Sequence, residues 1–109
     1  MKNLQSGRSV STSTLQVLEV LSDRISVGIF NSIAEKVTTT DNLVQLLGVT
    51  ARQYYTRQSY LMKTGLIQRR HGVLTLTSFG YLIYRALLII ASACRHYSLV
   101  IEDEMNIIV

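Results

Sequence analysis

Apolar residues recur three or four positions apart over residues 15–36, which is the spacing of one face of an α-helix. This stripe consists of Leu18, Leu21, Ile25, Ile29 and Ile33. Ser22 interrupts it, so the pattern predicts either one helix or a short entry helix followed by a main one. Residues 1–13 are rich in Ser and Thr, lack apolar periodicity and predict a flexible tail.

Two further helices are indicated by capping residues and glycines. The first has Thr39 or Thr40 as its N-cap, spans about two turns and stops at Gly48. The second is capped by Thr50, runs through about Lys63 and is ended by Gly65. Helical spacing places on one side of it Tyr54, Gln58, Leu61 and Met62, and on the opposite side Arg52, Thr56, Ser59 and Lys63.

The hydrophobic period changes after Gly65. Two short β-rich runs, "LIQRR" and "VLTLT", are joined by His71-Gly72, which predicts a tight hairpin with basic residues at its tip. Thr77 or Ser78 then caps a long apolar helix that we expect to end near Leu99. The acidic and apolar end "VIEDEMNIIV" either extends this helix or folds back as a separate element.

The length of the chain and the distribution of its charges limit the classes of function that it can have. The chain has 109 residues, enough for one small domain, and a formal net charge of +4. Between Asn42 and Ile101 every charged residue is Lys or Arg. A stretch of one sign favours a polyanionic partner, although a merely solvated basic face is the alternative.

The last helix is apolar around most of its circumference, and a domain of this size cannot cover it alone. We therefore expect a homodimer rather than a membrane span, because the uncharged run is short and is flanked by Arg85 and Arg95. The residues expected at the dimer interface are Leu82, Ile83, Ala86, Leu87, Ile90 and Cys94.

The sequence contains few residues in the patterns typical of catalytic or metal-binding sites. Cys94 and His96 are two positions apart on a helix and do not face the same way, so we expect no metal site and no cofactor. No nucleophile motif or phosphate-binding glycine loop is present in the sequence, and an enzyme is not expected. One cysteine allows no intrachain disulfide, and "MKNLQSGRSVSTST" has no apolar core typical of a signal peptide, which favours the cytoplasm.

The order of helices, hairpin and final helix is that of a winged helix-turn-helix domain. The segments "LSDRISVGIFNSIA", "TTTDNLVQLLGVTARQYYTRQSYLMKTGLIQRR" and "LTLTSFGYLIY" resemble archaeal winged-helix transcriptional regulators, relatives of the arsenical-repressor-like and multiple-antibiotic-resistance-like repressors. The resemblance implies a mostly α fold with a small β-hairpin wing and a long C-terminal dimerisation helix. It divides the chain into a tail (1–13), a DNA-binding domain (14–77) and a dimerisation helix with its tail (78–109). Gln58 stands where such proteins usually have Leu.

A recognition helix places its polar residues in the major groove of double-stranded DNA, where base edges are distinguishable. Candidates for base contacts are Arg52, Gln53, Thr56 and Tyr60, with Arg57 and Lys63 better placed for phosphates and Thr50 at the helix start. Wing residues Arg69, Arg70 and His71 would follow the backbone or enter the minor groove. The competing function is a winged-helix protein-interaction module in a transcription or chromosome assembly. The operator, any small-molecule effector and the direction of regulation are not determined by the sequence.

Overall fold

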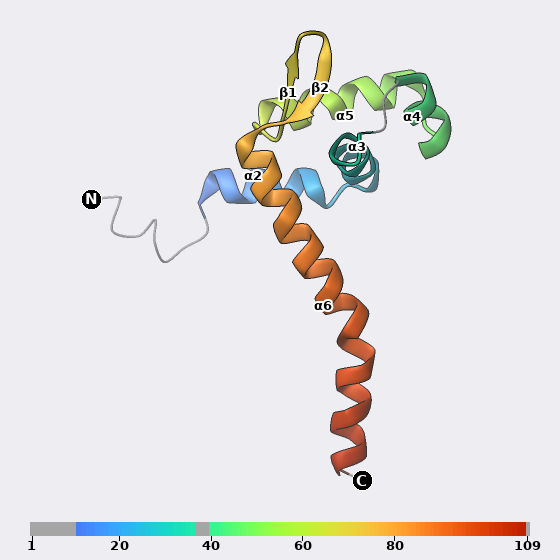
Figure 1. Cartoon of the computed structure of the whole chain (residues 1–109), viewed down its shortest axis with the longest axis vertical. Coiled ribbons are helices and arrows are strands. Elements are labelled where there is room, and N and C mark those ends of the chain that lie inside the picture. Colours follow the sequence, from blue (N-terminus) through green and yellow to red (C-terminus); the bar gives the residue numbers. More distant parts are fainter. Residues whose placement is uncertain (1–10, 37–39, 109) are drawn as a thin grey trace, which may run out of the picture.

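The computed structural model of the chain describes residues 11–36 and 40–108. Its elements, in chain order, are α2 (Thr12–Leu21), α3 (Arg24–Ala34), α4 (Thr40–Leu47), α5 (Ala51–Lys63), β1 (Ile67–Arg70), β2 (Val73–Leu76) and α6 (Ser78–Ile108). Five helices and one hairpin make this part of the chain mostly helical. Figure 1 shows the shorter helices and the hairpin gathered at one end of the molecule, with α6 extending away from them.

The N-terminal stripe is divided into two helices at Ser22. The hydroxyl of Ser22 donates to the carbonyl oxygen of Glu19 over 2.7 Å and ends α2, while Asp23 caps α3 by accepting from the backbone N–H of Ser26 at 2.9 Å. Helix α2 begins at Thr12, with Ser11 as its N-cap. Helix α2 thus includes residues 12 and 13, the last two of the predicted tail, while residues 1–10 of that tail lie outside the described residues.

The capping residues predicted for the central helices are confirmed, except for the N-cap of α4. Gly48 and Gly65 have positive φ angles of 65° and 80° and terminate α4 and α5. Thr50 caps α5 in a reciprocal capping box. Thr40 is already the first residue of α4, so the position before it, Thr39, lies outside the described residues.

The hairpin pairs β1 with β2 in antiparallel register, from Ile67 opposite Leu76 to Arg70 opposite Val73. Its turn residues His71 and Gly72 have φ angles of 51° and 79°. Two consecutive positive φ angles characterise the turn type that matches the twist of the strands, so the predicted two-residue turn is confirmed.

The core forms around α3, which is packed on α5 and on the other short elements. The hydrophobic residues at or below 2% exposure come from α3, from α5 and from the chain that enters the hairpin: Ile29, Phe30, Tyr54, Leu61, Leu66 and Ile67. Phe30 also meets Tyr84 of α6 edge-to-face, with ring centroids 6.2 Å apart. This contact is one of those that attach α6 to the rest of the domain.

Helix α6 is attached to the domain by its first turns only. Gly80 is buried so closely against the carbonyl of Leu66 that a Cβ atom would collide with it. Ile83, Tyr84 and Leu87 pack against the core. Beyond Leu87 the helix leaves the domain and continues to Ile108, past the expected end near Leu99, so of the two alternatives for the acidic end, extension of the helix is the one observed. The radius of gyration is 17.4 Å, compared with about 13 Å for a compact chain of this length.

Candidate nucleic-acid interface

The rotation of α5 is settled by its contacts with α3. Tyr54, Gln58 and Leu61 are buried beneath the helix, as their spacing predicts. Gln58 thus takes the inward position that an apolar residue usually fills, and its Oε1 atom has no hydrogen-bond partner there, like the hydroxyl of Tyr54. The exposed residues of α5 include Arg52, Gln53, Tyr55, Thr56, Ser59, Tyr60 and Lys63.

Two of the predicted contact residues also hold the start of α5. The backbone N–H of Thr50 donates to Oε1 of Gln53 at 3.0 Å, and the N–H of Gln53 donates to the Thr50 hydroxyl at 3.1 Å. The carbonyl oxygen of the Gln53 side chain is therefore engaged, while its amide NH₂ group has no bond to Thr50. Sequence spacing identified Thr50 as a cap, but the reciprocal role of Gln53 was missed, although Thr-x-x-Gln is its signal.

Arg57 was predicted to contact phosphate, and it forms an ion pair within the domain. Its Nε donates to Oδ2 of Asp23 at 3.0 Å, and the two side chains are 28% and 34% exposed. Burial alone would raise the pKa of Asp23, but hydrogen bonds from Ser26 and the charge of Arg57 outweigh it and hold that pKa below its ordinary value. Arg57 joins the middle of α5 to the start of α3, so it is a positioning residue first.

The hairpin carries the second group of predicted residues. Arg69, Arg70 and His71 are all exposed at or beside the turn. One guanidinium nitrogen of Arg69 lies 3.4 Å from the carbonyl oxygen of Gly72, a long contact that leaves its remaining donors available. The positive φ of His71 places this residue in the turn itself, where its side chain is away from the core.

These two groups face one side of the molecule. Helix α3 lies beneath α5 and the hairpin projects above it, so the side of α5 opposite α3 and the hairpin tip point the same way (Figure 1). Neither element contains an acidic residue, and none occurs in the sequence between Asn42 and Ile101. We call the exposed side of α5 together with the hairpin tip the basic face. Its positive charges are Arg52, Lys63, Arg69 and Arg70.

The predicted dimer residues fall into two groups. Leu82, Ala86, Ile90 and Cys94 are exposed, with Leu82 at 65% and Ile90 at 55%. Ile83 and Leu87 are instead half-buried against the domain's own core, so we leave them out of the interface. Apolar periodicity alone cannot tell which side of an apolar helix faces its own domain. Ile89 is 71% exposed and belongs to the first group, although it was not among the predicted interface residues.

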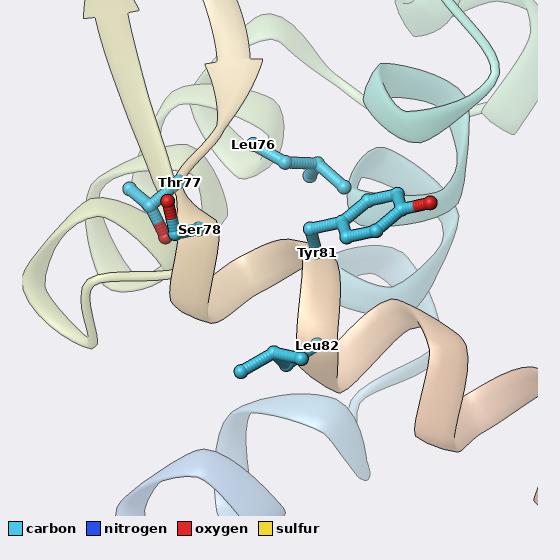
Figure 2. A pocket seen from close by; sticks show the side chains of 5 residues that line it. All are labelled: Leu76, Thr77, Ser78, Tyr81 and Leu82. Carbon is cyan, nitrogen blue, oxygen red and sulfur yellow. The ribbon is translucent and has the colours of Figure 1, made fainter.

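Shallow hollows lie along the first half of α6. One of about 520 Å³ is lined by Leu76, Thr77, Ser78, Tyr81 and Leu82, whose side chains surround the start of the helix (Figure 2). Its polar groups are hydroxyls, with no acid, histidine or lysine, so it offers no acid–base pair. Within residues 11–36 and 40–108, no group of three His, Cys, Asp or Glu residues is placed to hold a metal ion.

The segment Ser78–Tyr97 is long and apolar enough to cross a membrane by length and composition. Its first turns, however, are attached to the domain through Gly80, Ile83 and Tyr84. A span would have to begin after them, and Arg95 leaves only a short uncharged run. The attached first turns therefore shorten the part of α6 that a membrane span could use.

Known proteins offer no guide to this arrangement: no family model matches the chain, and no curated protein or solved structure is significantly similar to it.

Proposed function

We propose that the chain is a winged helix-turn-helix protein that binds double-stranded DNA as a homodimeric transcriptional regulator. The observation that supports this best is the basic face: a helix and a hairpin tip that point the same way, carry cations and lack acids. In this proposal α4 and α5 form the helix-turn-helix, α5 is the recognition helix and the hairpin is the wing.

The roles follow from exposure and position. A helix fits the major groove of B-DNA with its N-terminal residues at the base edges. Arg52 and Thr56 lie exposed in the first half of α5 and are assigned to bases, together with the free amide of Gln53 and with Tyr60. Lys63 and the wing residues contact phosphates or the minor groove. Arg57 supports the helix through Asp23 and contributes its remaining N–H donors to phosphate.

The dimer is formed by α6. Leu82, Ala86, Ile89, Ile90 and Cys94 provide an exposed surface along α6, from its attached first turns to the part beyond Leu87. A large apolar side chain contributes about 1.5 to 3 kcal/mol when it is fully buried, so association of two helices is favourable. Two-fold symmetry also presents two recognition helices to DNA, as palindromic sites require.

Binding to random-sequence duplex DNA at two salt concentrations tests the proposal. A basic face that contacts several phosphates loses affinity steeply as salt rises. Selection of bound sequences from a random library should then enrich an inverted repeat whose half-sites lie about one helical turn apart. Absence of DNA binding at low salt would overturn the proposal and favour a protein-interaction module.

A further inference from the structure

Tyr55 is a large aromatic residue of α5 to which the proposed function assigns no role. It follows the buried Tyr54 and precedes the exposed Thr56, and its own side chain is 52% exposed. Because successive residues of an α-helix are turned by about 100°, Tyr55 lies on the flank of α5. This flank runs between the side that packs on α3 and the opposite side that the proposal assigns to bases.

The ring of Tyr55 packs against its neighbour in the chain. The ring centroids of Tyr54 and Tyr55 are 5.2 Å apart and their planes meet at 83°, which is an edge-to-face pair. Tyr54 is fully buried, so the core of the domain fixes the ring on which Tyr55 rests. A ring that is already oriented loses little conformational freedom when it binds a partner.

The hydroxyl of Tyr55 is available to a partner. In the part of the chain that the structure describes, residues 11–36 and 40–108, no hydrogen bond involves this hydroxyl. Arg52 lies one turn before Tyr55 and is exposed, and α5 contains no acidic residue. A phenolic hydroxyl donates one hydrogen bond, and positive surroundings favour an anion as its acceptor.

The dimensions of the major groove indicate which anion a flank of α5 would meet. The groove of B-DNA is about 12 Å wide, and an α-helix with its side chains is about 10 to 12 Å across. The flanks of a helix in the groove therefore lie against the phosphate backbones that form its walls. Tyrosine hydroxyls are among the groups that bind phosphate oxygens of DNA, and such contacts fix the register of a helix without reading the sequence.

We propose that Tyr55 donates a hydrogen bond to a DNA phosphate at the wall of the major groove and thereby positions α5 for its base contacts. This inference rests on the DNA binding of the proposed function and adds to it a contact that carries no charge. Lys63 and the arginines of the wing displace counterions when they neutralise phosphates, whereas a neutral hydroxyl does not. Loss of the Tyr55 contact should therefore change the affinity and leave its salt dependence unchanged.

Tyr55→Phe tests the contact, because it removes the hydroxyl and keeps the ring on Tyr54. Urea unfolding should be unchanged, while the affinity for the selected inverted repeat, measured by fluorescence anisotropy, should fall about tenfold for each half-site. The factor should be the same for single-base variants of that site, and the slope of log affinity against log salt should remain that of the wild type. Tyr54→Phe is the matched control, since it removes a buried hydroxyl that DNA cannot reach, and its affinity should equal that of the wild type.

Methylphosphonate substitution of single phosphates in the DNA locates the contact. At the phosphate that Tyr55 binds, the substitution should weaken the wild type about tenfold more than Tyr55→Phe, because the variant already lacks that hydrogen bond. At every other phosphate the two proteins should lose affinity equally. Full affinity of Tyr55→Phe, or equal losses at all phosphates, overturns the role of Tyr55 while the proposed function stands. A wild-type protein that does not bind DNA at low salt overturns the proposed function itself.

Discussion

At the scale of single residues, Asp23 connects two elements that are far apart in the chain. Its carboxylate accepts from Ser26 in its own helix and from Arg57 of α5, 34 positions away. One side chain thus caps α3 and orients the helix assigned to DNA. The ionised form makes all three interactions, which is why the pKa of Asp23 is lowered despite its partial burial.

Asp23→Asn should therefore lower stability at neutral pH while preserving the helix cap, since Asn caps as well as Asp. Because the folded-state pKa is below the unfolded one, the wild-type advantage is present at neutral pH and is lost as the pH falls below about 4. Urea unfolding of both proteins at pH 7 and pH 3 measures this. A difference that persists unchanged at pH 3 would contradict the assigned role of the charge.

Gly80 fixes how closely α6 approaches the hairpin. Its missing side chain leaves room for the carbonyl of Leu66, which is backbone and cannot move aside like a side chain. Gly80→Ala should destabilise the domain by about 1 to 3 kcal/mol, as overpacking does. Gly28→Ala is the matched control, because its new methyl group would meet only the movable tip of Leu47. Equal stability of the two variants in urea would show that the contact at Gly80 relaxes easily.

At the scale of elements, α5 has a buried side that packs on α3 and an exposed side that the proposal assigns to DNA. Arg52→Ala with Thr56→Ala removes exposed groups that hold no cap, so the fold should be retained while specific DNA binding weakens. Each discriminating base contact contributes about 1 to 3 kcal/mol. Fluorescence anisotropy with the selected site measures the loss, and Ser59→Ala serves as the control on the same exposed side. Unchanged affinity of the double variant would reject this side of α5 as the reading surface.

Gln53 is unsuitable for the same test. Its side chain accepts the N–H of Thr50, so Gln53→Ala would remove part of the helix cap and cost about 0.5 to 2 kcal/mol of stability. A loss of DNA binding in that variant could come either from the lost contact with a base or from the weakened helix cap. The choice of Arg52 and Thr56 instead follows from the hydrogen bonds of the cap, which helical spacing alone does not reveal.

The hairpin should act on all DNA sequences alike. Replacing Arg69 and Arg70 by Gln removes two exposed charges from the tip and one long contact of Arg69 with the Gly72 carbonyl, while the turn residues His71 and Gly72 are retained. The dependence of log affinity on log salt should become shallower by roughly one unit for each phosphate that the hairpin no longer neutralises. Lys36→Gln, an exposed charge outside the basic face, should leave the slope unchanged. Loss confined to particular sequences would instead assign base reading to the hairpin.

Local signals in the sequence predict most of these elements. Caps and turn residues such as Thr50, Gly65 and His71-Gly72 act within a few residues of themselves, so their effect can be read from spacing. The ion pair of Arg57 with Asp23 could not be predicted, because it depends on how α5 lies on α3. The full length of α6 exceeds the expected end near Leu99. Glu is a good helix former and no proline interrupts the chain, so the acidic residues continue the helix instead of ending it.

At the scale of the whole molecule, α6 is the element that leaves large apolar side chains exposed in a single copy. Its half-buried residues Ile83 and Leu87 pack against the core of the domain, whereas Leu82, Ile89 and Ile90 are exposed in one copy. Within residues 11–36 and 40–108, no other element covers these exposed positions. The extended shape of the monomer is therefore an argument for association.

Leu82→Glu with Ile90→Glu should convert the dimer to a monomer, because burying an unpaired charge costs far more than the packing it replaces. Both residues are exposed in one copy, so the domain should still fold, and Ala91→Glu, on another side of α6, is the matched control that remains dimeric. Sedimentation equilibrium gives the mass of each protein. The monomeric variant should retain the basic face and bind a single half-site weakly, because it lacks the second recognition helix but keeps every interaction of the first. A wild-type protein that is monomeric at micromolar concentration would contradict the dimer, and the spacing of paired half-sites would then need another explanation.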